Sequence, residues 1–291
     1  MVFHYLLTRF NLSLWNKDKK GRKIDKDAWI ERRMSLFESY CLPSVTGQKC
    51  QNFIWVLLVD EDTPEGFRQA IKVYSKTCPQ IKLIGVKAHA AAYFPKIFQK
   101  VVIDDLKNRD WKDGDLCLTT YLDNDDSIHQ SFVDEVQKRC QCFNLKSDER
   151  RFLSFDYGLQ LFTELGNFCT RVFYPNNHFI TLAERLSDNG SLNYAKIRTC
   201  YGYGSHFLLE QNKMLKVCHV DNAKNPMWIE VVHGENVDND VKMTLHTRIV
   251  SDPGTLCRDF SLSLDVDTDH VLDFSLRAIK QVLRRTKNKF T

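Results

Sequence analysis

The first half of the chain alternates short apolar runs with amphipathic stretches. The apolar runs cover residues 5–10, 53–59, 81–86 and 116–122. Because a strand buried on both faces reads as an unbroken apolar run, these four segments predict inner strands of a parallel sheet. The stretches between and after them predict helices over residues 27–40, 64–77, 94–108 and 130–142. This alternation predicts an α/β fold with right-handed crossovers.

The helix predicted over residues 27–40 has one continuous apolar face, formed by Trp29, Ile30, Met34, Phe37 and Tyr40. Pro43 follows it closely. Proline lacks a backbone N–H and clashes with the preceding turn, so we expect the helix to end there.

The pattern changes after residue 142. Short antiparallel strands are predicted over residues 151–155, 158–162, 170–174 and 196–198. We expect this half to extend the sheet and to carry the acceptor side of a site. No repeat or linker divides the chain, so the prediction is one domain with three parts: residues 1–145, residues 146–270, and a basic C-terminal helix over residues 271–291.

Polar residues follow the ends of the predicted parallel strands, where α/β folds place their ligands. They are Arg9, Asp60 with Asp62, and Asp123 with Asp125. The run from Asp123 to Asp126 places three carboxylates and an amide together, and such charges repel unless a cation compensates them.

Hard oxygen ligands suit Mn²⁺ or Mg²⁺, and such an ion would stabilise charge on a leaving diphosphate. The alternative is a solvated turn that caps the following helix, with Asp126 as the capping residue.

Composition and charge describe an ordinary globular protein. The 291 residues are 43% hydrophobic and 27% charged, with a net charge of +4. Basic residues gather between Arg277 and Lys289 and are otherwise mixed with acidic ones, so we expect no nucleic-acid partner. The C-terminal helix is a candidate for peripheral contact with an anionic membrane, and a solvated helix packed on the domain is the alternative.

Ten cysteines are scattered along the chain without a disulfide pattern. They read as reduced thiols, and the spacing of Cys140 and Cys142 does not fit a structural zinc site. No secretory leader or membrane-spanning run is evident. We therefore expect a cytoplasmic protein, with the inner membrane face as the place where the basic helix would dock.

Four segments together resemble a known family: residues 4–11, residues 31–45, residues 60–64 and residues 226–237. The chain resembles the putative rhamnosyltransferase family of GT-A fold glycosyltransferases. The resemblance implies a GT-A-like, Rossmann-like and mainly parallel sheet flanked by helices, with a mixed or antiparallel acceptor-side extension. The implied activity is transfer of a sugar, named by the family as rhamnose, from a nucleotide-sugar to a glycan, a lipid-linked glycan or another hydroxyl acceptor in polysaccharide biosynthesis.

The resemblance also implies roles for individual residues. Nucleotide-sugar contacts would come from Thr8, Arg9, Phe10, Asp60, Asp62, Asp123 and Asn124. The ion, Mn²⁺ or Mg²⁺, would be bound by Asp123, Asp125 and His233. Asn236 would act near the acceptor or sugar. The chain departs from its relatives at Tyr121, where an arginine is common.

An inverting transfer, which we expect here, needs a carboxylate to take the proton of the acceptor hydroxyl, whereas a retaining one need not have a separate base. Asp156 is the first candidate and Glu230 the second, with Glu184 and Glu235 as alternatives. Trp228 is a candidate for stacking on a sugar ring, and a structural tryptophan is the alternative.

Two other functions fit parts of the pattern. A metal-dependent phosphohydrolase or nucleotidyltransferase would also use paired aspartates at strand ends, although no glycine-rich phosphate loop follows the first strand. A catalytically inactive carbohydrate- or nucleotide-binding module of a glycan assembly complex could keep the fold without the reaction.

Overall fold

A computed structural model gives the fold of the chain. It describes residues 1–12, 14, 25–146, 149–187, 196–204, 206, 209, 215–233, 241–242, 246–250, 252, 254–264, 269–277 and 279.

A seven-stranded sheet in the order β10-β6-β9-β4-β1-β2-β3 forms the centre of the molecule. Its strands are β1 (Val2–Arg9), β2 (Ile54–Asp60), β3 (Ile81–Val86), β4 (Leu116–Tyr121), β6 (Arg150–Phe155), β9 (Thr181–Arg185) and β10 (Lys216–Val220). Strands β3, β2, β1 and β4 run parallel. The four predicted apolar runs are therefore the four parallel strands, and the predicted α/β fold class is confirmed.

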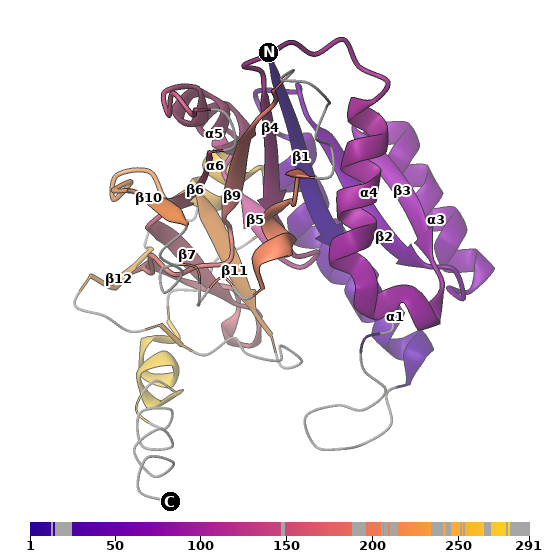
Figure 1. The fold of residues 1–291 in the computed structure, drawn as a ribbon. Helices are drawn as coiled ribbons and strands as arrows, with labels where there is room; N and C mark the ends of the chain where they lie inside the picture. Colours follow the sequence, from indigo (N-terminus) through magenta and orange to yellow (C-terminus); the bar gives the residue numbers. More distant parts are fainter. Residues whose placement is uncertain are drawn as a thin grey trace, which may run out of the picture.

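Helices cover both faces of this sheet (Figure 1). They are α1 (Lys26–Leu36), α3 (Glu65–Thr77), α4 (Phe94–Leu106) and α5 (Phe132–Gln141). Helices α1, α3 and α5 share one hydrophobic core with Leu6 of β1. Helix α4 shares another core with Tyr5 and Leu7, together with η5 (Cys200–Tyr203). Side chains of β1 thus alternate between the two layers, as the pleat requires.

The first helix does not end before Pro43. It continues through a π-helical segment, η1 (Phe37–Cys41), into α2 (Leu42–Thr46), with Pro43 in the first turn of α2. The carbonyl groups at this junction have side-chain partners, because Ser44 Oγ donates to Cys41 O (2.8 Å) and Ser127 Oγ donates to Tyr40 O (2.9 Å). The proline is tolerated because it stands where a helical turn restarts.

A second, five-stranded sheet has the order β12-β8-β7-β11-β5. Its strands are β5 (Ser127–Ile128), β7 (Tyr157–Phe162), β8 (Phe168–Phe173), β11 (Trp228–Val232) and β12 (Arg248–Ile249), and η3 (Thr163–Leu165) follows β7. The predicted mixed or antiparallel extension is therefore confirmed, since β9 extends the main sheet by antiparallel pairing with β4 and β6, but a separate second sheet was not predicted. Strands β7 and β8 leave the main sheet, β11 runs parallel to β7, and residues 196–198 form no strand.

The last described segments are α6 (Gly254–Phe260) and a helical stretch over residues 271–277, which lies below the second sheet in Figure 1. The rest of the predicted C-terminal helix, residues 280–291, lies outside the described residues. Among the described helices, none is long and apolar enough to cross a membrane. All ten cysteines are free thiols, and six of them are buried.

Candidate functional site

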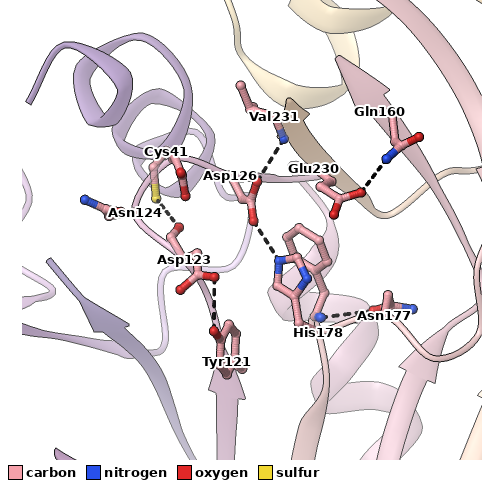
Figure 2. A network of polar contacts seen from close by, with 12 residues as sticks. Cys41, Tyr121, Asp123, Asn124, Asp126, Gln160, Asn177, His178, Glu230 and Val231 are labelled. Carbon is pink, nitrogen blue, oxygen red and sulfur yellow. Dashed lines mark hydrogen bonds and ion pairs between the residues drawn. The ribbon is translucent and has the colours of Figure 1, made fainter. Parts of the chain in front are cut away.

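The acid run, Asp123 to Asp126, follows the end of β4 and leads directly into β5. Strands β1 and β2 end at the same edge of the sheet, and Figure 2 shows the polar contacts of the run. Asn124 holds this turn in place. Its Nδ2 atom donates to Phe10 O (2.8 Å) just beyond β1. Asn124, Asp125 and Asp126 are all buried, whereas the Asp123 side chain is about 30% exposed. The carboxylates therefore lie at the junction of the two sheets.

Arg9, the last residue of β1, reaches Asp123 from the α4 layer. Its Nη2 atom lies 3.2 Å from Asp123 Oδ1 and 2.6 Å from the Tyr121 hydroxyl, which itself donates to Asp123 Oδ2 (3.0 Å). The guanidinium also packs over the rings of Phe94, Tyr121 and Tyr201 at 5.0 to 5.7 Å. Burial alone would lower the pKa of Arg9, but Tyr121, Tyr201 and Asp123 raise it. Arg9 thus places a fixed positive charge beside Asp123.

Arg33 of α1 reaches the same loop from the opposite layer. Its Nη1 atom donates to Asn124 Oδ1 (3.0 Å) and to Asp125 Oδ2 (2.9 Å). His233 follows β11, and its Nε2 atom lies 3.0 Å from the same Asp125 oxygen. Burial alone would raise the pKa of Asp125, but Arg33 and the hydrogen bond to His233 outweigh burial and lower it. Asp125 is therefore a buried carboxylate in its charged form.

Asp126 faces the second sheet. Its Oδ1 atom accepts a hydrogen bond from Val231 N (2.9 Å) of β11, and its Oδ2 atom lies 2.7 Å from His178 Nε2 (Figure 2). Burial raises the pKa of Asp126, and the hydrogen bond to His178 offsets only part of that rise. Helix α5 begins at Phe132 without a side-chain cap. The proposed capping role of Asp126 is therefore wrong, because its carboxylate contacts β11 and the turn before β9 instead.

The donor atoms close enough to share a cation belong to Asp123, Asp126 and His178 among the described residues. They lie within 4.8 Å of one another. Two carboxylates and an imidazole form a donor set that fits a divalent ion such as Mn²⁺. Of the expected set of Asp123, Asp125 and His233, Asp125 and His233 do lie together at 3.0 Å, whereas Asp123 pairs with Arg9.

Glu230 of β11 lies beside this cluster (Figure 2). It is buried, accepts a hydrogen bond from Gln160 Nε2 (2.7 Å) and forms an ion pair with Lys242. Its carboxylate also contributes to raising the pKa of His178, whose pKa burial would otherwise lower. Glu230 is thus electrostatically coupled to the site.

Asp156, the other candidate base, follows β6 in the main sheet. Its Oδ1 atom lies 2.8 Å from Nδ1 of His219, which belongs to β10. Strands β6 and β4 are both antiparallel to β9, so Asp156 lies at the same edge of the main sheet as the acid run. Glu184, by contrast, is buried in β9 and accepts hydrogen bonds from Arg150 and from the backbone N–H groups of Arg198 and Thr199. These contacts fix it as a structural carboxylate.

Three predicted site residues lie in the core instead. Thr8 is buried and accepts a hydrogen bond from Trp55 Nε1 (2.9 Å), and Phe10 packs edge-on against Phe37. Trp228 is fully buried, stacks on Phe179 at 5.1 Å and donates from Nε1 to Phe155 O (2.8 Å). The expected sugar stacking by Trp228 is contradicted, because no face of its ring reaches the surface.

Asp60 and Asp62 follow β2. Asp60 Oδ1 accepts a hydrogen bond from Asp62 N (2.9 Å), so the first carboxylate shapes its own turn and the second side chain is exposed. Asn236, together with Gly234 and Glu235, lies outside the described residues.

The sequence profile of the family described as putative rhamnosyl transferase matches residues 3–245, which is well over half of the chain. The chain belongs to that family. No curated protein matches it in sequence.

Solved structures of TarS from S. aureus are among those to which this family member is similar. One TarS structure has 10% identity and a TM-score of 0.41, over 80% of this chain and 37% of its own. TarS residues 1–349 in complex with UDP have 12% identity and a TM-score of 0.39, over 80% and 61%. The complex with UDP-GlcNAc has 9% identity and a TM-score of 0.39, over 81% and 60%. The chain therefore spans 37% to 61% of these structures.

Sequence reasoning missed two residues that this member of the rhamnosyl transferase family places in the site. Arg33 lies in a segment that carries the resemblance, but the helical pattern alone marks it as a polar position beside Met34. His178 precedes β9 in a polar turn, Asn176-Asn177-His178, and no periodicity points to it. The only signal for either residue was that Arg33 lies in a segment that carries the family resemblance.

Proposed function

We propose that the chain is a glycosyltransferase that binds the diphosphate of a nucleotide-sugar at the ends of β1 and β4. The observation that supports this most is the meeting of carboxylates and fixed cations in one loop: Arg9 with Asp123, and Arg33 with Asp125. A diphosphate is recognised by guanidinium groups through charge-assisted hydrogen bonds. The family description makes rhamnose the first donor sugar to test.

Charge develops on the diphosphate as the bond to the sugar breaks. Arg9 is held by the rings of Phe94, Tyr121 and Tyr201 and by the Tyr121 hydroxyl, so its charge is already positioned to meet the diphosphate. Asp123, Asp126 and His178 would hold a divalent ion, Mn²⁺ or Mg²⁺, which when bound supplies further positive charge beside the leaving group. Asp125, fixed by Arg33 and His233, keeps the loop in position.

The acceptor hydroxyl must lose a proton during transfer. Glu230 and Asp156 are the two candidate bases, and each is held by a cationic or imidazole partner. We expect the correct one to be revealed by Glu230→Gln and Asp156→Asn. The variant that lacks the base should lose kcat by at least about a hundredfold while it still binds the donor nucleotide.

Thermal unfolding with a panel of nucleoside diphosphates and nucleotide-sugars, with and without Mn²⁺, tests the donor site. We expect one nucleotide class to raise the unfolding temperature, and Asp123→Asn to lose that effect. Asp134→Asn is the matched control, because it removes an exposed carboxylate of α5 that pairs with Lys138.

If no nucleotide stabilises the wild-type protein under any metal condition, the proposal fails. Stabilisation without sugar release or transfer would instead favour the inactive binding module. Hydrolysis of simple phosphate esters would favour the phosphohydrolase.

A further inference from the structure

The helical residues 271–277 are fixed to the second sheet by one side only. Phe274 is buried, and its ring lies 5.3 Å from the rings of both Phe162 and Phe168. Arg277 Nη2 lies 2.9 Å from Oε2 of Glu164, in the turn after β7. These contacts set the orientation of the helix on the domain.

The opposite side of the same segment is apolar and exposed. Leu272 is 78% exposed, Leu276 54% and Ile279 56%. Steps of four and three residues place them in one stripe along a helix. Among the described residues, eight large apolar side chains are exposed, and four of them lie between Val271 and Ile279. A concentration of this kind on one short segment marks an interaction surface.

The sequence around this stripe is strongly basic. Six basic residues, and no Asp or Glu, occur from Phe274 to the last residue: Arg277, Lys280, Arg284, Arg285, Lys287 and Lys289. Leu283 continues the apolar spacing four residues after Ile279. A leucine-rich stripe next to clustered Lys and Arg is the pattern of a helix that lies in the surface of an anionic bilayer.

We propose that the stripe of Leu272, Leu276 and Ile279 enters the interface of an anionic lipid bilayer, to which the basic sequence that follows it adds electrostatic attraction. A nucleic acid would satisfy the charges but would leave the apolar stripe in water. A second copy of the chain would bring two equally basic segments together. The bilayer matches both features at once.

The anchoring contacts also relate this surface to the acid run. Phe162 at the end of β7 pairs in register with Val232 at the end of β11, and His233 follows immediately. Docking would therefore bring this end of the second sheet towards the lipid. This orientation would favour an acceptor that is carried by a lipid. That consequence rests on the proposed function, whereas the binding of vesicles does not.

Flotation of the full chain with vesicles of phosphatidylglycerol and phosphatidylcholine tests the proposal, with phosphatidylcholine vesicles for comparison. We expect binding to the anionic vesicles at about 0.1 M salt and weaker binding at about 1 M, where charges are screened. Changing Leu272, Leu276 and Ile279 together to Ser should weaken partition at least about tenfold. Val73→Ser with Tyr93→Ser is the matched control, because these side chains are 51% and 60% exposed elsewhere.

A second variant replaces Arg284, Arg285, Lys287 and Lys289 by Gln. Its affinity for anionic vesicles should fall by on the order of a hundredfold or more. The dependence of binding on salt should disappear as well. The unfolding temperature of the triple Ser variant should match the wild type, since its changed side chains are exposed.

Several results would overturn the inference. They are a wild-type chain that ignores anionic vesicles, a triple Ser variant that binds them as well as the wild type, and preferential binding to duplex DNA or RNA. Self-association in sedimentation velocity that only the triple Ser variant abolishes, without vesicle binding, would assign the stripe to a second copy instead.

Discussion

Each carboxylate of the acid run lies beside its own guanidinium or imidazole group. Asp123 faces Arg9 at 3.2 Å, Asp125 faces Arg33 at 2.9 Å, and Asp126 faces His178 at 2.7 Å. An anionic ligand would compete with these carboxylates for the same cations. The loop is therefore held in place before a ligand arrives, and each guanidinium is available to a phosphate at the cost of one existing ion pair.

Arg9→Lys should weaken nucleoside diphosphate binding by about tenfold or more. Lysine keeps the charge but loses the planar group that packs over Phe94 and Tyr201 and donates to Tyr121 and Asp123. Calorimetric titration measures the affinity. Arg109→Lys is the control, since Arg109 packs over Phe3 and pairs with Asp105 away from the acid run. Equal losses in both variants would contradict a special role for Arg9.

His4 should make folding stability depend on pH. It is fully buried in β1, its Nε2 atom lies 2.8 Å from Thr120 Oγ1, and burial lowers its pKa to about 3. The folded chain therefore keeps His4 neutral, whereas the unfolded chain protonates it below about pH 6.5. Its contribution to the free energy of unfolding is complete above pH 6.5, falls as the pH drops, and is lower by about 2 kcal/mol at pH 5.

Urea unfolding of His4→Gln at pH 7 and pH 5 measures this effect. The variant should lose less stability between the two pH values than the wild type does. His89→Gln, at an exposed position, should follow the wild type. A His4→Gln profile as steep as that of the wild type would assign the pH dependence to other groups.

Single positions explain why Arg9 lies beside the acid run while its neighbours Thr8 and Phe10 lie in the core. Side chains of a strand alternate between faces, so Thr8 and Phe10 must point into the layer that packs on Trp55 and Phe37. The alternation was readable from the sequence. The partners of Asp126 were not, because His178 and Val231 are brought to it by pairing between strands far apart in the chain.

The contact between β7 and β11 depends on close packing at Gly158 of β7. A Cβ atom at Gly158 would lie 2.0 Å from Cδ2 of Trp228, whose ring joins β11 to the main core. Strands β7 and β11 are neighbours in the second sheet, so the missing side chain lets the ring lie flat against the strand.

Gly158→Ala should lower the free energy of unfolding by about 2 kcal/mol or more, since both the ring and the strand are enclosed. Gly66→Ala in α3 is the matched control. A Cβ there meets nothing within 4 Å among the described residues, so stability should stay equal or rise by up to about 1 kcal/mol. Denaturant unfolding measures both, and a harmless Gly158→Ala would refute the packing argument.

Elements with long apolar runs were predicted well, and those in the second half were not. The four parallel strands bury both faces, which leaves a plain signal in the sequence. Strands β9, β10 and β11 are short, and β9 reaches its place between β4 and β6 only through pairing with both. Which strands leave the main sheet is decided by such non-local pairing, which no local pattern records.

At the scale of the whole molecule, the two sheets share their interior. One core contains Leu6 of β1, Phe132 of α5, Phe155 of β6 and Trp228 of β11. Strand β4 is also paired on one side by β9 from the second half of the chain. The first 145 residues therefore depend on the later ones for both core and sheet edges.

A fragment of residues 1–145 should accordingly fail to unfold cooperatively, whereas the full chain should unfold in one transition. The fragment would expose the edge of β4 and much of the shared core. Scanning calorimetry and circular dichroism measure both. A fragment that melts as sharply as the full chain would show that residues 1–145 form an independent domain.

The π-helical segment Phe37–Cys41 also limits how the length of this chain can change between relatives. A π turn stores in effect one residue more than an α turn, and each residue of an α-helix advances it by about 100°. Deleting one residue here would restore a regular α turn and leave Arg33 facing Asp125. Deleting one between Arg33 and Phe37 would instead rotate Arg33 by that angle, away from the acid run.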